Sequence, residues 1–276
     1  MTTDAVSAPR VRIDSSTSVD GRMITLADGV LSITMNRPDS LNSLTEAMLS
    51  GIADAVERAA DDDRVRVVRL GGAGRGFSSG AGIGEEDQKG GGTSSPTKII
   101  DEANRAVRAL TALPKPAVAV VHGPAAGVAA SLALGCDIVL ASEKAFFMLA
   151  FTKILMPDGG ASALIAAAVG RVRAMRMALL AERVPAREAL DWGLVTAVYP
   201  AEEFGAEVDK VVAALVDGPA LAFRKTKQAI NAATLTELED AFDREKQGQS
   251  VLITSHDFVE GMLAFQQRRS ASFTDS

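Results

Sequence analysis

Cysteine and histidine are scarce in this 276-residue chain. The single cysteine, Cys136, cannot form a disulfide bond within the chain, which excludes a disulfide-stapled fold. Because it lies in the apolar run LGCDIVLA, we expect it to be buried as a small hydrophobic residue. The two histidines are far apart in the sequence, so we expect no histidine-rich metal site and no metal. Aromatic residues make up 4% of a chain that is 47% hydrophobic, which favours a core of small side chains.

An excess of positive charge and long uninterrupted apolar runs are also lacking. The formal net charge is −6, which disfavours a general role on nucleic acids or membrane surfaces. The N-terminal stretch, residues 1–21, has no apolar core of a signal peptide. The longest apolar tract, residues 117–134, is interrupted by HGP and consists mostly of small side chains, which argues against a membrane helix. We therefore predict a cytoplasmic protein without nucleic-acid or membrane partners.

Strand-like and helix-like segments alternate along most of the chain. Residues 23–26 and 30–35 are predicted to form two strands joined by a turn at Asp28-Gly29. A helix is predicted over residues 45–60, with Thr45 as its N-terminal cap. From about residue 202 onward the patterns are helical only. This order predicts a layered α/β core followed by a helical C-terminal region.

The glycine-rich stretch GRGFSSGAGIGEE, residues 74–86, follows a predicted strand over residues 65–70. A phosphate-binding loop is excluded, because the chain has no Gly-Lys pair and this stretch has no Gly-x-Gly-x-x-Gly pattern. The segment GFSSG does match Gly-x-Ser-x-Gly, with Ser78 as the nucleophile of a serine hydrolase. In such enzymes the serine lies directly between a strand and a helix. Here GGAGR separates Ser78 from the strand and no helical pattern follows, so we disfavour this interpretation.

The residues of this stretch are compatible with two other interpretations. Glycines let backbone N–H groups approach a ligand without obstruction by side chains. Such groups would stabilise a developing oxyanion, by about 3–4 kcal/mol for each donor in a transition state. The alternative is a flexible surface loop without a ligand. The spacing of the residues does not distinguish between the two.

Several ordered motifs between residue 22 and the C-terminus resemble the crotonase superfamily, the enoyl-CoA hydratase/isomerase group. They include MNRP and LNSL, the glycine-rich stretch, HGPAAGVAASLALGCDIVLAS, AFFMLAFTKI followed by MPDGG, and RVRAMRMALLAERVPAREALDWGLV. Motifs in this order are more specific than any single glycine pattern. The AFTK and PDGG segments resemble the branch of ring-epoxide isomerases of the phenylacetate pathway.

The resemblance implies a spiral of ββα units over residues 21–201. The N-terminus is rich in Ser, Thr and Asp, which predicts a disordered tail at residues 1–20. The resemblance further implies a helical region at residues 202–276 and assembly into a homotrimer or a hexamer, a dimer of trimers. It also implies an acyl-CoA substrate, with coenzyme A as part of the substrate and no separate cofactor. The thioester oxygen would lie between the backbone N–H groups of Ala81 and Val128. The residues expected to contact the coenzyme A moiety are Arg37, Leu44, Ser79 and Ile83.

The chain departs from the superfamily at two positions that bear on the chemistry. Hydratases of the superfamily use two glutamates, and Ser131 and Phe151 stand in their places, where we expect them to contact the substrate. Neither side chain can act as a carboxylate base. Asp158, in the MPDGG motif, is the carboxylate that remains, and it would either transfer a proton or cap the helix that follows. We expect His122 to be a structural hydrogen-bonding residue.

The resemblance and these departures together favour one reaction. Two N–H groups that hold a thioester enolate acidify the neighbouring carbon, so that a single base suffices for isomerisation, without a metal or a redox cofactor. We therefore expect an acyl-CoA isomerase. A non-catalytic acyl-CoA-binding protein and an atypical enoyl-CoA hydratase stay open as alternatives.

Overall fold

The computed structural model describes residues 13–82, 96–153 and 158–274. Its larger sheet has seven strands in the order β1-β2-β3-β4-β5-β7-β10. The first three strands pair antiparallel, and the pairs from β3 to β10 are parallel. The strands are β1 (Ile13–Val19), β2 (Arg22–Ala27), β3 (Val30–Met35), β4 (Val67–Gly72), β5 (Ala117–Val121), β7 (Ile138–Ser142) and β10 (Ala197–Tyr199).

The prediction of a disordered tail over residues 1–20 is wrong for residues 13–19. These residues form β1, which pairs with β2 through a tight turn at Asp20-Gly21. Both turn residues have positive φ, which Gly adopts freely and Asp tolerates. The polar side chains of β1 resemble a tail in sequence, but an edge strand needs only backbone pairing to β2 on one side. Residues 1–12 lie outside the described part of the chain.

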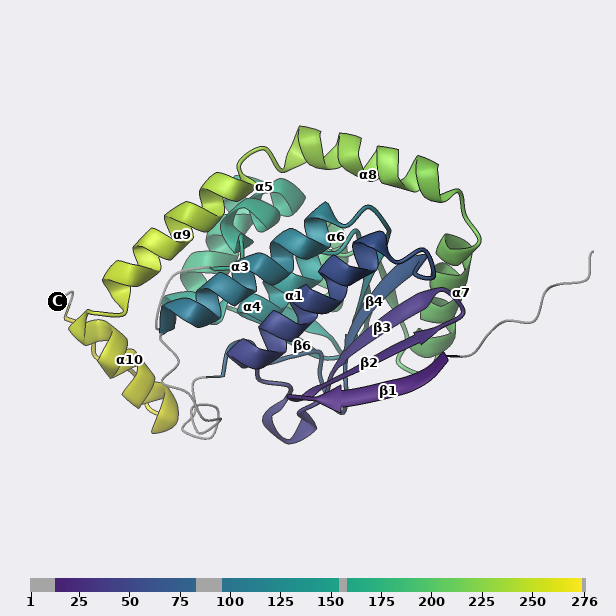
Figure 1. Cartoon of the computed structure of the whole chain (residues 1–276). Coiled ribbons are helices and arrows are strands. Elements are labelled where there is room, and N and C mark those ends of the chain that lie inside the picture. Colours follow the sequence, from purple (N-terminus) through teal and green to yellow (C-terminus); the bar gives the residue numbers. More distant parts are fainter. Residues whose placement is uncertain (1–12, 83–95, 154–157, 275–276) are drawn as a thin grey trace, which may run out of the picture.

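Helices cover both faces of the larger sheet (Figure 1). β3 alternates between half-buried and buried positions, and Leu31, Ile33 and Met35 contribute to the main core. This core includes residues of α1 (Glu46–Asp61) and α3 (Pro96–Ala112), which lie side by side. On the opposite face, α7 (Phe204–Val216) packs against the sheet in a second apolar cluster.

A second, smaller sheet continues the chain toward the candidate site. It consists of β6 (Pro124–Ala126), β8 (Phe146–Met148) and β9 (Val184–Pro185), with β8 in the middle. The short helix α4 (Val128–Leu134) begins directly after Gly127 and packs against α3 and α5. The remaining helical segments before α7 are η1 (Pro38–Ser40), η2 (Ala150–Lys153), α5 (Ala161–Leu180) and α6 (Ala186–Trp192).

The chain after α7 forms helices, as the sequence predicts. α8 (Ala220–Thr234), α9 (Leu238–Leu252) and α10 (His256–Gln266) form an arch along the outside of the molecule (Figure 1). Of the three, α9 contacts both α3 and α5. Within the described residues, no helix is long and apolar enough to cross a membrane, and the cytoplasmic location stays a prediction.

Local sequence signals locate several elements correctly. The helix predicted from residue 45 is α1, and the hydroxyl of Thr45 accepts a hydrogen bond from the N–H of Met48 at 3.2 Å. The predicted strand pair corresponds to β2 and β3. Cys136 is free and buried, and burial raises the pKa of its thiol. Its predicted role as a small buried hydrophobic residue is confirmed.

Candidate active site

The glycine-rich segment is held between two other segments of the chain. On one side, the N–H of Leu44 donates to the carbonyl of Gly80 at 2.8 Å, and the N–H of Gly82 donates to the carbonyl of Leu44 at 2.8 Å. On the other side, Ser78 forms a parallel bridge with Ala125 of β6. The interpretation as a free surface loop is therefore wrong for residues 78–82, which backbone hydrogen bonds fix in place.

Gly80 and Gly127 lie against each other at the junction of these segments. A Cβ atom on Gly80 would come 3.6 Å from the Cα of Gly127 and 2.6 Å from the carbonyl oxygen of Ala126. Both glycines have positive φ, +92° and +55°. A side chain at Gly80 would meet the backbone of the neighbouring segment. Glycine at both positions thus allows the two loops to approach closely.

The peptide groups that follow these two glycines leave one N–H on each loop available. In a trans peptide, the N–H points opposite to the carbonyl of the same peptide group. Because the Gly80 carbonyl accepts from Leu44, the N–H of Ala81 points away from Leu44. The Gly127 carbonyl accepts from Ala130 within α4, so the N–H of Val128 points out of that helix. Within the described residues, neither N–H donates a hydrogen bond.

Ser131 and Phe151, the residues predicted to stand at the glutamate positions of hydratases, both lie next to these loops. The aromatic ring of Phe151 would be 3.6 Å from a Cβ on Gly127, so it covers that glycine. Ser131 is fully buried, and its hydroxyl donates to the backbone carbonyl of Asp158 at 2.9 Å. A Cβ on Gly159 would come 2.9 Å from the Ser131 Cβ and 3.4 Å from Cγ2 of Val128. The turn that carries Asp158 therefore packs on the first turn of α4.

The carboxyl group of Asp158 is buried and poorly solvated. The residue is 6% exposed, and its Oδ1 atom has no hydrogen-bond partner among the described residues. Burial, with a further contribution from the negative charge of Glu245, raises the pKa of Asp158 to about 8. At neutral pH this carboxyl group is largely protonated. A pKa close to the working pH suits a group that both accepts and releases a proton.

The alternative role of Asp158, as the side-chain cap of the following helix, is wrong. The residue at the N-cap of α5 is Gly160, and Glu245 of α9 receives the N–H groups at this helix end. Sequence reasoning missed Glu245, which lies 85 residues from Gly160 in the chain. One signal was present, because Glu245 falls on the buried face of α9 among apolar residues such as Phe242.

The other predicted contact residues surround the loop that precedes Gly80. Leu44 is fully buried in the core, and its backbone holds the Gly80 peptide group. Arg37 donates from Nη1 to the carbonyl of Ser43 at 2.8 Å. Ser79 is exposed, and its hydroxyl donates to the carbonyl of Ser40. Ile83 lies outside the described residues. The contacts of these residues with coenzyme A stay predictions.

Asn42 connects this loop to the glycine-rich stretch, and sequence reasoning did not assign it this role. Its side chain is fully buried, and Nδ2 lies 2.8 to 3.1 Å from the carbonyl oxygens of Ala73, Gly76 and Phe77. Its Oδ1 accepts the N–H of Arg37 at 2.9 Å. The amide of Asn42 therefore fixes the segment that leads to Ser78.

The serine-hydrolase interpretation is wrong. Ser78 is fully buried, and its hydroxyl donates to the carbonyl of Asn42 at 2.7 Å. The same oxygen accepts the N–H of Gly80 at 3.1 Å, so the hydroxyl is used to shape the loop. Neither histidine contacts Ser78: the Nε2 atom of His122 lies 2.9 Å from the carbonyl oxygen of Gly74, and His256 is exposed on α10. The structural role predicted for His122 fits this contact.

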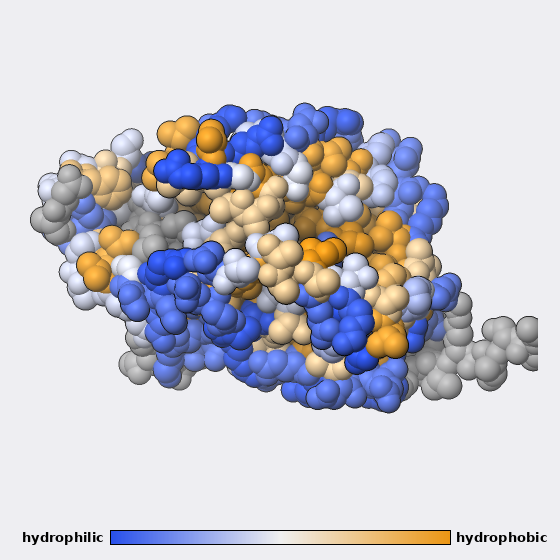
Figure 2. Space-filling model, turned by 90° about the horizontal axis from the view of Figure 1, so that it is seen from above, coloured by the Kyte–Doolittle hydropathy of each residue, from blue (hydrophilic) through white to orange (hydrophobic). Residues whose placement is uncertain are grey.

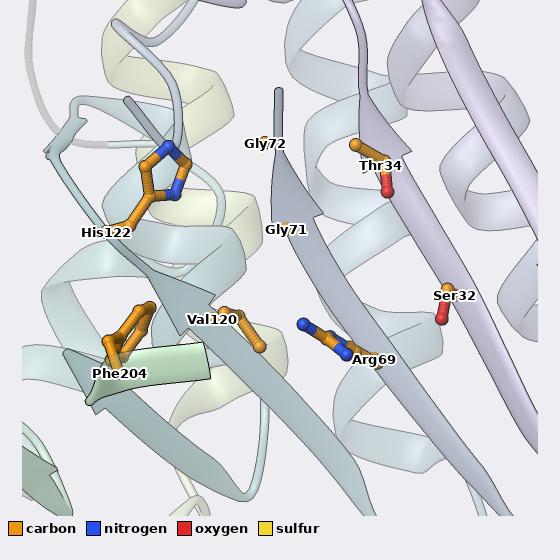
Figure 3. A pocket seen from close by; sticks show the side chains of 8 residues that line it. All are labelled: Ser32, Thr34, Arg69, Gly71, Gly72, Val120, His122 and Phe204. Carbon is orange, nitrogen blue, oxygen red and sulfur yellow. The ribbon is translucent and has the colours of Figure 1, made fainter. Parts of the chain in front are cut away.

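A cavity of about 450 Å³ opens elsewhere, on the face of the larger sheet that α7 covers. Figure 3 shows Ser32, Thr34 and Arg69 on one side of it and His122, Val120 and Phe204 on the other. None of the predicted catalytic or substrate-binding residues lines it. The guanidinium group of Arg69 pairs with Asp209 at 3.1 Å. The backbone N–H groups of Ala81 and Val128 and the buried carboxyl group of Asp158, by contrast, are of the kinds that bind an anion and transfer a proton, so we locate the candidate active site there.

Comparisons with known proteins agree with this geometry. The family model described as enoyl-CoA hydratase/isomerase matches residues 25–276. The 1,2-epoxyphenylacetyl-CoA isomerase of Escherichia coli K12 is 37% identical over 89% of this chain and 95% of its own length. A probable enoyl-CoA hydratase of Rhodobacter capsulatus is 37% identical over 90% of this chain and 96% of its own length. The crystal structure of an enoyl-CoA hydratase from Mycobacterium avium subsp. paratuberculosis K-10 is 69% identical, with a TM-score of 0.87, and the match covers 94% of this chain and 100% of that one. This chain therefore belongs to the enoyl-CoA hydratase/isomerase family of the crotonase superfamily and has its spiral fold.

Proposed function

We propose that this protein is an isomerase that acts on an acyl-CoA thioester through an enolate intermediate. The observation that carries the proposal is the close approach of Gly80 and Gly127, with the N–H groups of Ala81 and Val128 available and the turn of the buried Asp158 packed against Val128. Coenzyme A is part of the substrate, and the proposed reaction involves proton transfers alone. Each step below assigns a role to a group of this chain.

The two backbone N–H groups bind the thioester oxygen in our proposal. When a proton leaves the carbon next to the thioester, negative charge moves onto this oxygen. Hydrogen bonds from Ala81 and Val128 become stronger as the charge develops, so they stabilise the transition state more than the substrate. Each donor contributes about 3 kcal/mol to such stabilisation.

Asp158 moves the proton in this proposal. The reaction starts from the ionised form of Asp158, which is the minority form at neutral pH because the pKa is about 8. For a substrate with a double bond between C3 and C4, this carboxylate takes a proton from C2, and the electron pair of the C–H bond forms the enolate. The enolate then collapses with a C2–C3 double bond, and C4 takes the proton back from Asp158. No atom is gained or lost, and one carboxyl group serves as base and then as acid.

Isomerisation is favoured over hydration because of the residues at Ser131 and Phe151. Hydration across a double bond requires groups that hold a water molecule and transfer its protons. Phenylalanine cannot do so, and the Ser131 hydroxyl is already engaged with the Asp158 carbonyl. The names of the relatives do not choose between the reactions, because an isomerase and a probable hydratase are equally similar to this chain.

The test follows deuterium and double-bond position in the same reaction. The protein is incubated in deuterated water with 3-enoyl-CoA and, separately, with 2-enoyl-CoA, and the products are analysed by ultraviolet absorbance and mass spectrometry. We expect migration of the double bond and loss of at least about a hundredfold in rate in Asp158→Asn. The matched control is Asp240→Asn, the same chemical change on the exposed face of α9.

Two outcomes would overturn the proposal. Addition of water without double-bond migration would show a hydratase of unusual composition. Tight binding of acyl-CoA thioesters without exchange or turnover across a panel of acyl groups would show a binding protein. Because both outcomes need intact binding, the affinity for a saturated acyl-CoA is measured first by calorimetry.

We also propose that the chain assembles as a trimer or as a dimer of trimers. α8 buries none of its residues within one chain. The face that α8 crosses shows apolar residues gathered between hydrophilic borders (Figure 2). Exposed apolar side chains lie on α5, α8 and α10: Val172, Leu179, Leu180, Leu221, Ile230, Val259 and Phe265. Light scattering should give a mass about three or six times the 28.7 kDa of one chain, and a monomer would contradict the proposal.

A further inference from the structure

The carboxylate of Glu245 reaches from α9 into the turn that carries Asp158. Its Oε2 atom accepts the N–H of Gly160 at 2.8 Å, and its Oε1 atom accepts the N–H of Ser162 at 2.9 Å and the hydroxyl of Ser162 at 2.5 Å. Glu245 is 1% exposed. Three hydrogen bonds and the positive end of the α5 helix dipole all stabilise its ionised form.

Asp158 lies two residues before Gly160 and has the opposite surroundings. Its Oδ1 atom is buried, and no group in the described part of the chain forms a hydrogen bond with it. Two buried carboxyl groups that lie close together repel each other when both are ionised, so one of them holds a proton. Burial raises the pKa of both groups, but the hydrogen bonds to Glu245 lower its pKa in part. Glu245 is therefore the ionised group of the pair, and Asp158 is the protonated one.

The other elements that pack on this turn bring neutral polar groups to it. From α3, Asn104 accepts the N–H of Gly159 at 3.2 Å, and from α4, Ser131 donates to the Asp158 carbonyl. Among the described residues, Glu245 is the charged group that acts on Asp158. Arg244 lowers the pKa of Glu245 slightly from the exposed side of α9.

The nearby basic side chains of α3 and α9 form ion pairs at the surface. Lys246 pairs with Asp101 at 2.6 Å, and Arg108 pairs with Glu239 at 2.7 Å. These pairs connect α9 to α3. Their positive charges are thus balanced at the surface and do not offset the negative charge of Glu245 at the turn.

Glu245 also determines where the turn lies. A Cβ on Gly160 would come 2.6 Å from Leu238 and 2.8 Å from Phe242, so the turn is pressed against α9 on the same face as Glu245. On its other side the turn contacts Ser131 through Gly159. The carboxylate of Glu245 thus fixes the backbone of the turn between α9 and α4, and with it the position of Asp158 relative to Val128.

We propose that Glu245 is a positioning residue, which fixes the turn of Asp158 against α4 and by its negative charge keeps Asp158 protonated before substrate binds. The role of Asp158 as the proton carrier rests on the function proposed above. The effect of Glu245 on the protonation of Asp158 is independent of that function. A residue of the C-terminal helical region therefore completes the candidate active site without contacting the reacting atoms.

The test measures the titration of Asp158 directly in the full-length protein. Carbon-13 NMR of protein labelled at the aspartate carboxyl carbon gives the midpoint, and Asp158→Asn identifies the signal. In Glu245→Gln, we expect the midpoint of Asp158 to fall by about one pH unit or more from its value near 8. Glu237→Gln, the same change at the exposed residue that precedes α9, should leave the midpoint unchanged.

Ser162→Ala separates the charge of Glu245 from its contacts. This variant removes one hydrogen bond to Glu245 but keeps the carboxylate. We expect Asp158 to titrate as high as in the unmodified protein, or higher. If instead the midpoint of Asp158 is unchanged in Glu245→Gln, or falls equally in Ser162→Ala, Glu245 has a structural role alone and the proposal is overturned.

A reciprocal measurement covers the case in which Glu245→Gln does not fold. Because Glu245 ionises while Asp158 is still protonated, Asp158→Asn should leave the midpoint of Glu245 nearly unchanged, measured with carbon-13 at the glutamate carboxyl carbon. A clear fall of the Glu245 midpoint in this variant would show that Asp158 ionises first and would contradict the proposal. If isomerisation is absent while these titrations are as expected, the proposed function fails and the proposal for Glu245 stands.

Discussion

Gly80 and Gly127 pack so closely that a Cβ on Gly80 would lie 3.6 Å from the Cα of Gly127. The two residues come from loops that follow different strands, β4 and β6. Each loop contributes the peptide group that follows its glycine. The contact between the glycines is therefore the physical basis for the two N–H donors of the proposed oxyanion site.

Gly80→Ala should separate these loops. The new methyl group would be 2.6 Å from the carbonyl oxygen of Ala126, and φ of +92° is strained for alanine. Since the Ala81 N–H would then move away from the thioester oxygen, we expect kcat/KM for isomerisation to fall by a factor of about 100 or more. Steady-state kinetics on 3-enoyl-CoA measures this effect.

The control for that experiment is Gly205→Ala. Gly205 lies near the start of α7, and a Cβ there meets no atom within 4 Å. We expect unchanged kinetics and an equal or slightly higher melting temperature, because alanine is the better helix former. If Gly80→Ala kept full activity, the role of the Ala81 N–H would be refuted.

Asn42→Ala should destabilise the glycine-rich loop from outside the active site. It removes the amide that lies within hydrogen-bond distance of three backbone carbonyls and leaves them buried. It also places alanine at φ of +56°, where asparagine is tolerated better. We expect a loss of about 2–4 kcal/mol in the free energy of unfolding, measured by urea denaturation. A loss below about 0.5 kcal/mol would show that the carbonyls find other partners.

Local and non-local parts of the fold differ in how far the sequence predicts them. α1 is predictable because its apolar periodicity and its Thr45 cap both lie within the helix. β6, β8 and β9 have three, three and two residues, which is too short for any periodicity to appear. β1 escapes prediction because its pairing with β2, and not its composition, makes it a strand.

The candidate site shows the same division. Backbone N–H groups carry no side-chain signal, so Ala81 and Val128 could be assigned by family resemblance but not by residue chemistry. The sequence does identify Asp158 as the carboxyl group that remains. Its environment depends on Glu245, whose carboxylate joins the turn through contacts across more than 80 residues, and no local pattern predicts such a contact.

Ser131→Ala tests whether Ser131, predicted to stand at the position of the first hydratase glutamate, has a catalytic or a structural role. The variant removes the hydroxyl that donates to the Asp158 carbonyl at 2.9 Å and leaves that carbonyl without this bond. We expect a loss of about 1–2 kcal/mol in the free energy of unfolding. The rate of isomerisation should fall less than about tenfold, because the variant loses a structural contact and keeps the group that transfers the proton. A loss as large as that of Asp158→Asn would assign Ser131 a catalytic role.

Asp158→Asn should change the dependence of stability on pH. Burial raises the pKa of Asp158 from 3.8 to about 8 in the folded chain, so between these values the unfolded chain releases a proton that the folded chain keeps. The stability that this group contributes is therefore complete below the unfolded value and is lost as pH rises toward about 8. Asparagine does not titrate and avoids this loss.

We accordingly expect the variant to gain stability relative to the unmodified protein as pH rises from about 4 to about 8, by a few kcal/mol in total. Urea denaturation across this range measures the difference, and Asp240→Asn serves as the control because its carboxyl group is exposed. Glu245 is present in both proteins and titrates in the same direction, so its contribution cancels in part. A constant difference between Asp158→Asn and the unmodified protein over this range would mean that Asp158 is ionised in the folded state. Asp158 could then still act as the base, but the proposal that Glu245 keeps it protonated would be refuted.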